Sequence, residues 1–154
     1  MDINYPNKDD QTGLMVCAYH KQHAALDMLL QEPSLVVNNV DKHGYTAVHY
    51  NCSNNNSTAV DNLCKTPIVL VNTVDKFGDT ALLVAVKCNN FSCVVAFLQV
   101  AQLAWNVRDS MGDSAIMVAL KAGKLDKVKF MIKLPGVELS SRDKENKTLE
   151  NIAR

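Results

Sequence analysis

The sequence predicts an all-α fold, a solenoid of stacked helix pairs joined by tight turns. Two observations support this prediction. An Asp-x-x-Gly turn followed by a hydroxyl residue recurs every 34 residues, and a second landmark, an Asn that follows an apolar residue, recurs in the same phase. Fixed periods of this size are typical of repeat proteins, in which each unit buries its apolar face only against its neighbours.

The turn landmark is clearest in residues 41–47, which read Asp-Lys-His-Gly-Tyr-Thr-Ala, and its copies begin at Asp75, Asp109 and Asp143. Gly supplies the positive φ of a tight turn, and the Asp side chain can accept hydrogen bonds from nearby backbone amides. A hydroxyl residue follows each turn and is suited to cap a helix. These capping residues are Thr46, Thr80, Ser114 and Thr148. Each unit is therefore expected to start with a turn and then a helix.

A first short helix is clearest at residues 81–86 and 115–120, and a break precedes a second helix with paired apolar residues such as Phe97-Leu98. The second landmark, which is Asn38, Asn72, Asn106 and, in the last copy, Ser140, follows the second helix. We predict units at 7–40, 41–74, 75–108 and 109–142 and a partial unit at 143–154, all in one domain of residues 1–154. Residues 51–66 are expected to form the least regular pair, because the segment 51–58 is rich in poor helix formers.

These residues resemble the ankyrin repeat, whose pattern runs Asp-x-x-Gly-x-Thr-Pro-Leu-His-x-Ala, then Leu-Leu, then Val-Asn. The resemblance covers nearly the whole chain. Two departures are that no unit has Pro after the hydroxyl residue and that the period is one residue longer than the usual value of about 33. The extra residue falls after the second helix, so we expect only a longer outer loop.

The resemblance implies a non-catalytic module for protein–protein interaction within a larger signalling or regulatory protein. The partial unit at the C-terminal end is either a short cap or part of a longer chain, and we favour the longer chain. Two alternatives stay open: a free-standing inhibitor that sequesters a transcription factor or a kinase, and a module that presents substrates to an appended enzyme.

Ankyrin arrays usually bind partners through their turn tips and the exposed side of the first helices, which line a concave groove. The residues that this implies here are His43, Tyr45, Phe77, Asp79, Met111, Asp113, Lys87 and Lys121. Among them, His43, Phe77 and Met111 occupy equivalent positions and should form a stripe along the tips. Large side chains at turn tips are costly to leave in water unless they meet something. The alternative is that Phe77 and Met111 pack on the adjacent turn.

Composition limits the other functions. The 16 acidic and 16 basic residues balance, so no net field attracts nucleic acid or an anionic membrane. The longest apolar runs are far shorter than the roughly 20 residues of a membrane span, and the N-terminus does not resemble a signal peptide. Five cysteines without paired-loop spacing favour a reducing compartment, the cytoplasm or the nucleus. We therefore expect a monomer with a protein partner and no nucleic acid or membrane partner.

No catalytic, cofactor-binding or metal-binding residue is predicted. Cys17, His20 and His23 are spaced like metal ligands, but a structural zinc site requires four convergent ligands and no second cluster of suitable spacing follows. Cys88 and Cys93 have no base nearby that could activate a nucleophile. The single tryptophan, Trp105, aligns with Val37, Val71 and Leu139, so it is expected in the core rather than as a binding anchor.

Overall fold

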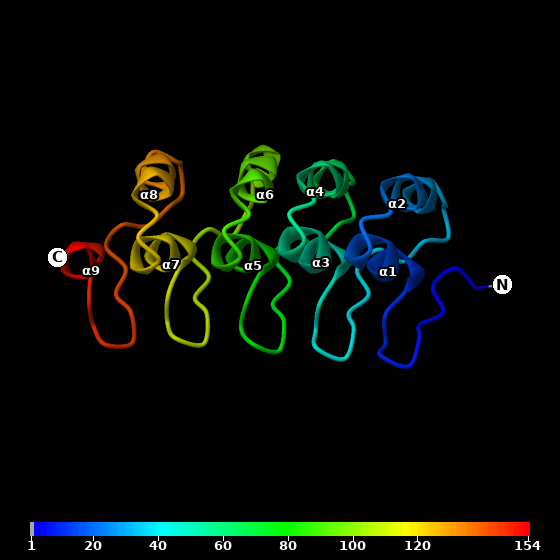
Figure 1. Cartoon of the computed structure of the whole chain (residues 1–154), viewed down its shortest axis with the longest axis horizontal. Coiled ribbons are helices and arrows are strands. Elements are labelled where there is room, and N and C mark those ends of the chain that lie inside the picture. Colours follow the sequence, from blue (N-terminus) through cyan, green and yellow to red (C-terminus); the bar gives the residue numbers. More distant parts are fainter. Residues whose placement is uncertain (1) are drawn as a thin grey trace.

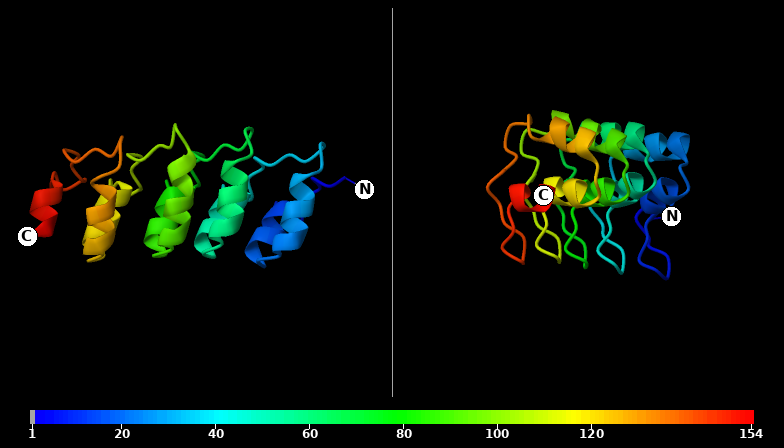
Figure 2. Two further views of the ribbon diagram at one scale, coloured as in Figure 1. Left: turned by 90° about the horizontal axis from the view of Figure 1, so that it is seen from above. Right: turned by 60° about the vertical axis from the view of Figure 1, so that its left-hand side comes forward.

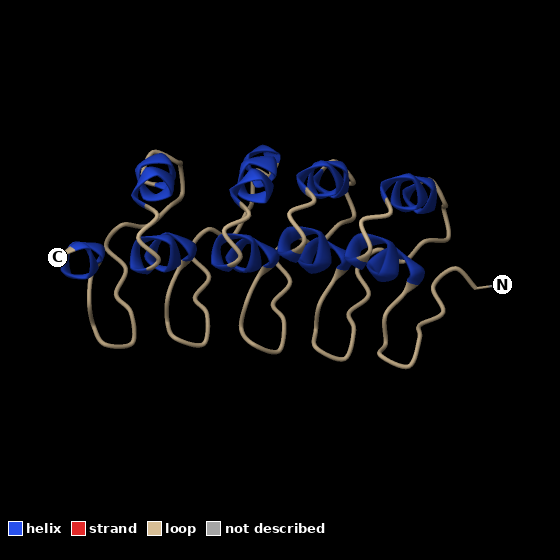
Figure 3. Cartoon of the chain, viewed as in Figure 1, coloured by secondary structure: helices blue, strands red, loops and turns tan. Residues whose placement is uncertain are grey.

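The computed structural model describes residues 2–154 and shows two layers of helices with a row of turns on one side (Figure 1). The first helices form one layer and the second helices the other, and the turn tips project from the first layer on the side away from the second (Figures 1 and 2). The first helices are α1 (Gly13–Tyr19), α3 (Ala47–Ser53), α5 (Ala81–Lys87), α7 (Ala115–Lys121) and α9 (Leu149–Ala153). The second helices are α2 (His23–Leu30), α4 (Ser57–Cys64), α6 (Phe91–Ala96) and α8 (Leu125–Met131). Loops make all the other connections except the 3-10 helix η1 (Phe97–Gln99), which continues α6 (Figure 3). The predicted all-α solenoid is confirmed.

The 34-residue step is visible in the start of every first helix, since the residues before them are Thr12, Thr46, Thr80, Ser114 and Thr148. A hydroxyl cap was predicted at the last four of these positions and forms at three of them. The side chains of Thr46, Thr80 and Thr148 each accept a hydrogen bond from the backbone amide three residues later. Thr12 and Ser114 make no such bond, so the expectation of a side-chain cap at Ser114 is wrong.

The core consists of the interfaces between neighbouring units. Helix α3 illustrates this arrangement, because it contributes to two clusters of buried side chains. Ala47 and Tyr50 belong to the cluster that contains Leu14 and Leu26 of the first unit. Val48 and Cys52 belong to the larger cluster that runs through α5 to Met131 in α8. Each unit is therefore stabilised by its neighbours, as repeat architectures require.

The Asn landmark has a clear structural role. Each Asn side chain bridges to the loop of the next unit, where its Nδ2 donates to one carbonyl and its Oδ1 accepts from one amide. For Asn72 these partners are the Gln102 oxygen at 2.9 Å and the Ala104 nitrogen at 2.9 Å. Asn4 makes the same pair of bonds, to the Ser34 oxygen at 2.8 Å and from the Val36 nitrogen at 2.7 Å.

Asn4 was not recognised as a landmark, although it lies 34 residues before Asn38 and follows the apolar Ile3. Through these bonds, residues 2–6 contact the first unit in the way that residues 36–40 contact the second unit. The repeat register therefore extends upstream of residue 7, at which the first unit was predicted to begin.

The expectation that residues 51–66 form the least regular pair is wrong. Helix α4 is regular over eight residues, whereas α6 has six residues before the chain tightens into η1. Asn51 and Asn56 are buried and hydrogen-bonded to each other at 2.7 Å, and Asn51 Nδ2 also donates to the Ala47 oxygen at 2.9 Å. These bonds stabilise a segment whose intrinsic helix preference is low.

Candidate functional site

The turn tips are rigid because an aspartate side chain closes each one. At the tip of the third unit, Asp75 Oδ1 accepts the backbone amides of Phe77 at 2.8 Å and Asp79 at 2.9 Å. Gly78 at this turn has a φ of +87°, which a residue with a Cβ rarely adopts. Asp41, Asp109 and Asp143 accept the equivalent pairs of amides. The residue in the middle of each tip therefore has a fixed backbone.

Large side chains at these middle positions face solvent. Phe77 is 57% exposed and Met111 is 65% exposed, and His43 is exposed as well. The rings of His43 and Phe77 stack with centroids 6.3 Å apart, and the Lys76 amide donates to the His43 carbonyl at 2.9 Å. Adjacent tips thus contact each other, but more than half of the Phe77 surface remains free. We call His43, Phe77 and Met111 the tip stripe.

Four of the predicted binding residues form ion pairs inside the protein. Lys87 Nζ lies 2.7 Å from Asp79 Oδ1 and 2.9 Å from Asp109 Oδ2 of the next unit. Lys121 Nζ repeats this arrangement with Asp113 at 2.8 Å and the Asp143 carboxylate at 2.9 Å. The carboxylates are buried and the lysines are partly exposed. Each lysine therefore links two consecutive tips. We call the surface between the tips and the ends of the first helices the inner face; it includes Tyr45, Asp79, Lys87, Asp113 and Lys121.

The electrostatics of the Lys87 bridge show competition between burial and pairing. Burial acts to lower the pKa of Lys87, but its bonds to the two aspartates outweigh burial and raise that pKa. Burial likewise acts to raise the pKa of Asp109, whereas Lys87 and two backbone amides prevail and lower it. For Asp79, burial prevails over Lys87 and the pKa is raised. Asp109 therefore stays ionised to a lower pH than Asp79 does.

Tyr45 occupies the position that Asp79 and Asp113 hold in the following units. It is half-buried, and its ring stacks on the buried His49 ring with centroids 5.4 Å apart. Its ring edge also meets Tyr50 at 5.5 Å. The inner face is therefore aromatic in the second unit and ionic in the third and fourth.

A match between this sequence and a family model identifies the family. The model of a family described as ankyrin repeats (3 copies) matches residues 67–143, which is half of the chain. The chain belongs to the ankyrin-repeat family. Its resemblance to that family, first seen in the turn and Asn landmarks, is confirmed.

Among solved structures, the ankyrin repeat domain of Bcl-3, described as a unique member of the IkappaB protein family, is similar to this chain. The two share 25% sequence identity and superpose with a TM-score of 0.89, over 100% of this chain and 68% of the Bcl-3 chain. No curated protein sequence matches the chain significantly. The ankyrin fold is a protein-interaction scaffold, and this chain is a repeat module of that type.

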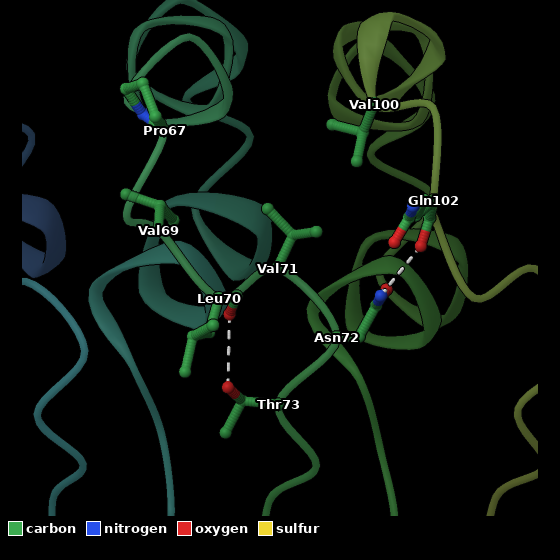
Figure 4. A pocket seen from close by; sticks show the side chains of 8 residues that line it. All are labelled: Pro67, Val69, Leu70, Val71, Asn72, Thr73, Val100 and Gln102. Carbon is green, nitrogen blue, oxygen red and sulfur yellow. Dashed lines mark hydrogen bonds between the residues drawn. The ribbon is translucent and has the colours of Figure 1, made fainter.

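The ankyrin array also has an apolar groove away from the tips, between the loops that follow the second helices (Figure 4). The groove has a volume of about 530 Å³ and lies between Pro67–Thr73 and the loop at Val100 and Gln102. Leu70 in its lining is 62% exposed, and the Asn72 side chain holds the two loops together through its bond to Gln102. The lining residues come from the loops that carry Asn72 and follow η1.

The residues weighed for metal or thiol chemistry include Cys17, Cys88 and Cys93, which are free thiols. Within residues 2–154, no group of three His, Cys, Asp or Glu side chains could hold a metal ion. All five cysteines are free, and Cys52 and Cys93 are fully buried in the larger core cluster. Trp105 packs against that same cluster but is only half-buried, so the expected core position is met only in part. In the part of the chain that the structure describes, no helix has the length and apolar character needed to cross a membrane.

Proposed function

We propose that this ankyrin-repeat module binds a protein partner through the tip stripe and the inner face, with Phe77 as the principal anchor. The observation that carries the proposal is the row of large side chains that the fold fixes in place without burying. The Phe77 backbone is held by Asp75, yet its ring is 57% exposed at the middle of the array. An ordered aromatic ring loses little conformational freedom on binding, and aromatic residues are frequent interface anchors. Met111 in the tip stripe and Tyr45 on the inner face would supply neighbouring contacts.

The test is Phe77→Ala, assayed by thermal unfolding and by retention of partners from a cell lysate. Truncation should lower the affinity by about 2 kcal/mol, which is roughly 30-fold, because a desolvated ring is lost. It should leave the melting temperature nearly unchanged, because the ring is outside the core. Met28→Ala is a matched control, since Met28 is 72% exposed on α2, away from the tips. Undiminished retention by Phe77→Ala with a melting temperature lowered by about 5 °C or more would assign the ring to structure.

We also infer an intracellular location, cytoplasmic or nuclear. The five free thiols support it, because free cysteines persist in reducing compartments. Protein purified without oxidant and then denatured should titrate as five thiols. A reproducible count of three or fewer would contradict the inference. The monomeric state and the absence of a nucleic-acid partner stay predictions.

A further inference from the structure

The second oxygen of the turn aspartates shows an irregularity in the array. At Asp109 and Asp143, Oδ2 is paired with Lys87 and Lys121 of the preceding unit, at 2.9 Å in both cases. At Asp41, Oδ2 accepts the Tyr50 hydroxyl at 2.5 Å. Within residues 2–154, Asp75 Oδ2 has no hydrogen-bond partner, although Asp75 is only 6% exposed. A buried carboxylate oxygen without a partner is costly, and so it needs an explanation.

The repeat register explains why the partner is missing. The lysine that reaches Asp109 is the last residue of α5, and the equivalent last residue of α3 is Ser53. The Ser53 hydroxyl is too short to take the place of a lysine ammonium and donates instead to the Tyr50 carbonyl at 2.9 Å. The residue equivalent to Tyr50 in the third unit is Val84, which cannot donate. Asp75 therefore lacks both of the donors that serve the other three turn aspartates.

We propose that the position between Tyr45, Ser53 and Asp75 binds a basic side chain, arginine or lysine, of the protein partner. The incoming cation takes the place that Lys87 and Lys121 occupy in the next two units. Lys87 pairs with Asp79 and Asp109, whereas Asp75 forms no ion pair within residues 2–154. The inner face is therefore short of one positive charge at this position, which a basic partner residue would supply.

The surroundings suit a cation with an apolar stem. Tyr45 stands where an aspartate stands in the following units, so the cation would lie beside an aromatic ring, a favourable contact for arginine or lysine. Burial raises the pKa of the Tyr45 hydroxyl, and the nearby charges of Asp75 and Asp79 raise it further. The hydroxyl therefore stays neutral and can donate and accept hydrogen bonds. Because Asp75 Oδ2 is covered in the free chain, entry of the cation requires rotation of a neighbouring side chain. Tyr45 is half-exposed and is the residue that we expect to rotate.

This inference rests on the proposed function, and it deepens it by naming the chemistry of the partner. The first experiment uses an acetylated and amidated Gly-Arg-Gly peptide as the probe, followed by amide NMR shifts of the whole chain. We expect saturable shifts at Tyr45, Ser53 and residues 75–79, with a Kd of about 1 mM. The same peptide with citrulline in place of arginine is the uncharged control. Equal shifts with the citrulline peptide would overturn the proposal.

Two variants localise the binding. Asp75→Asn keeps an oxygen for the Phe77 and Asp79 amides but removes the charge, and we expect the peptide Kd to rise at least fivefold. Ser53→Lys supplies the missing ammonium within the chain, and we expect it to abolish the peptide-induced shifts while Asp75 is still present. A titration that neither variant changes would place the cation elsewhere and overturn the proposal.

A stability cycle gives a readout that does not depend on the peptide. Ser53→Lys should raise the melting temperature by about 2 to 4 °C if Asp75 Oδ2 gains a partner. The same change in an Asp75→Asn background should raise the melting temperature much less. Comparing the two backgrounds cancels the effect of lysine on helix propensity. An equal effect in both backgrounds would show that the two positions do not pair and would contradict the proposal.

The interaction surface and the cation site can be tested independently of each other. Phe77→Ala keeps the backbone amide that Asp75 Oδ1 accepts, so it should leave the peptide titration unchanged. Loss of partner retention in Phe77→Ala together with a negative peptide titration would reject the cation site and keep the interaction surface. A positive titration together with normal retention by Phe77→Ala would keep the cation site and reject Phe77 as the anchor.

Discussion

His49 shows how a single side chain joins two units. Its Nδ1 lies 3.2 Å from the Thr46 backbone nitrogen, which can only donate, so Nδ1 is the acceptor. Nε2 therefore carries the proton and donates to the Asp79 carbonyl of the next tip at 3.2 Å. The neutral imidazole thus caps α3 and at the same time binds the third unit. Protonation of Nδ1 would place its N–H against the Thr46 N–H. The ring is also fully buried, so both effects disfavour the charged imidazolium.

We predict that His49 makes the stability of the module depend on pH. Burial lowers its pKa below the ordinary 6.5, although the bond to Asp79 and nearby carboxylates act to raise it. Because the pKa is lower in the folded state, the unfolded chain binds the proton first. Stability is then complete above about pH 6.5 and falls as the pH decreases through the folded-state pKa. Urea unfolding of the wild type between pH 7.5 and 5.5 should show this decrease.

The matched variant is His49→Asn, because Asn151 at the equivalent position of α9 forms the same capping box with Thr148. It should lose about 1 kcal/mol at pH 7.5, since the bond to Asp79 is gone, and its stability should vary less with pH. His43→Asn controls for an exposed histidine. If His49→Asn and the wild type lose stability equally between pH 7.5 and 5.5, His49 is not the titrating group.

At the scale of the element, the sequence predicted the positions of the first helices because their start is a local signal. A turn Asp, a Gly and a hydroxyl residue lie within six residues and need no tertiary contact to be recognised. The prediction for residues 51–66 was wrong for the opposite reason. Asn counts as a poor helix former because its side chain competes for backbone hydrogen bonds, but here Asn51 and Asn56 bond to each other in a buried position. Tertiary context overrode the local preference.

The candidate site likewise has a part that the sequence predicts and a part that it does not. The tip stripe was predictable, since the middle residue of a tight turn faces outward whatever its neighbours are. The bridges of Lys87 and Lys121 were not recognised, because each joins a helix end to a turn 22 residues away, and the distance depends on how units stack. The unpaired oxygen of Asp75 could not be predicted from the sequence, because it is seen only when all four turn aspartates are compared in three dimensions.

At the scale of the whole molecule, the core is divided into interfaces, and this division governs how the chain unfolds. The smaller cluster joins the first unit to one side of α3 and α4, and the larger cluster joins their other side to α5 through α8. In such arrays, stability is a sum of unit terms and nearest-neighbour terms, so weakening one interface need not weaken the next. Trp105 packs against the larger cluster and is the only tryptophan, so its fluorescence reports that part alone.

We predict different outcomes for the same substitution in the two clusters. Leu26 and Leu83 are both almost fully buried, Leu26 in the smaller cluster and Leu83 in the larger. Leu→Ala at either site should cost about 2 to 5 kcal/mol, because transfer energy is lost and a cavity is left. In Leu26→Ala, loss of helical circular dichroism should begin at lower urea than the change in Trp105 fluorescence, whose midpoint stays near that of the wild type. In Leu83→Ala, both signals should shift together to lower urea, because the weakened interface includes the surroundings of the probe. If Leu26→Ala moved the fluorescence midpoint as far as Leu83→Ala does, the first unit would be fully coupled to the rest, and the module would unfold as one cooperative block despite its linear architecture.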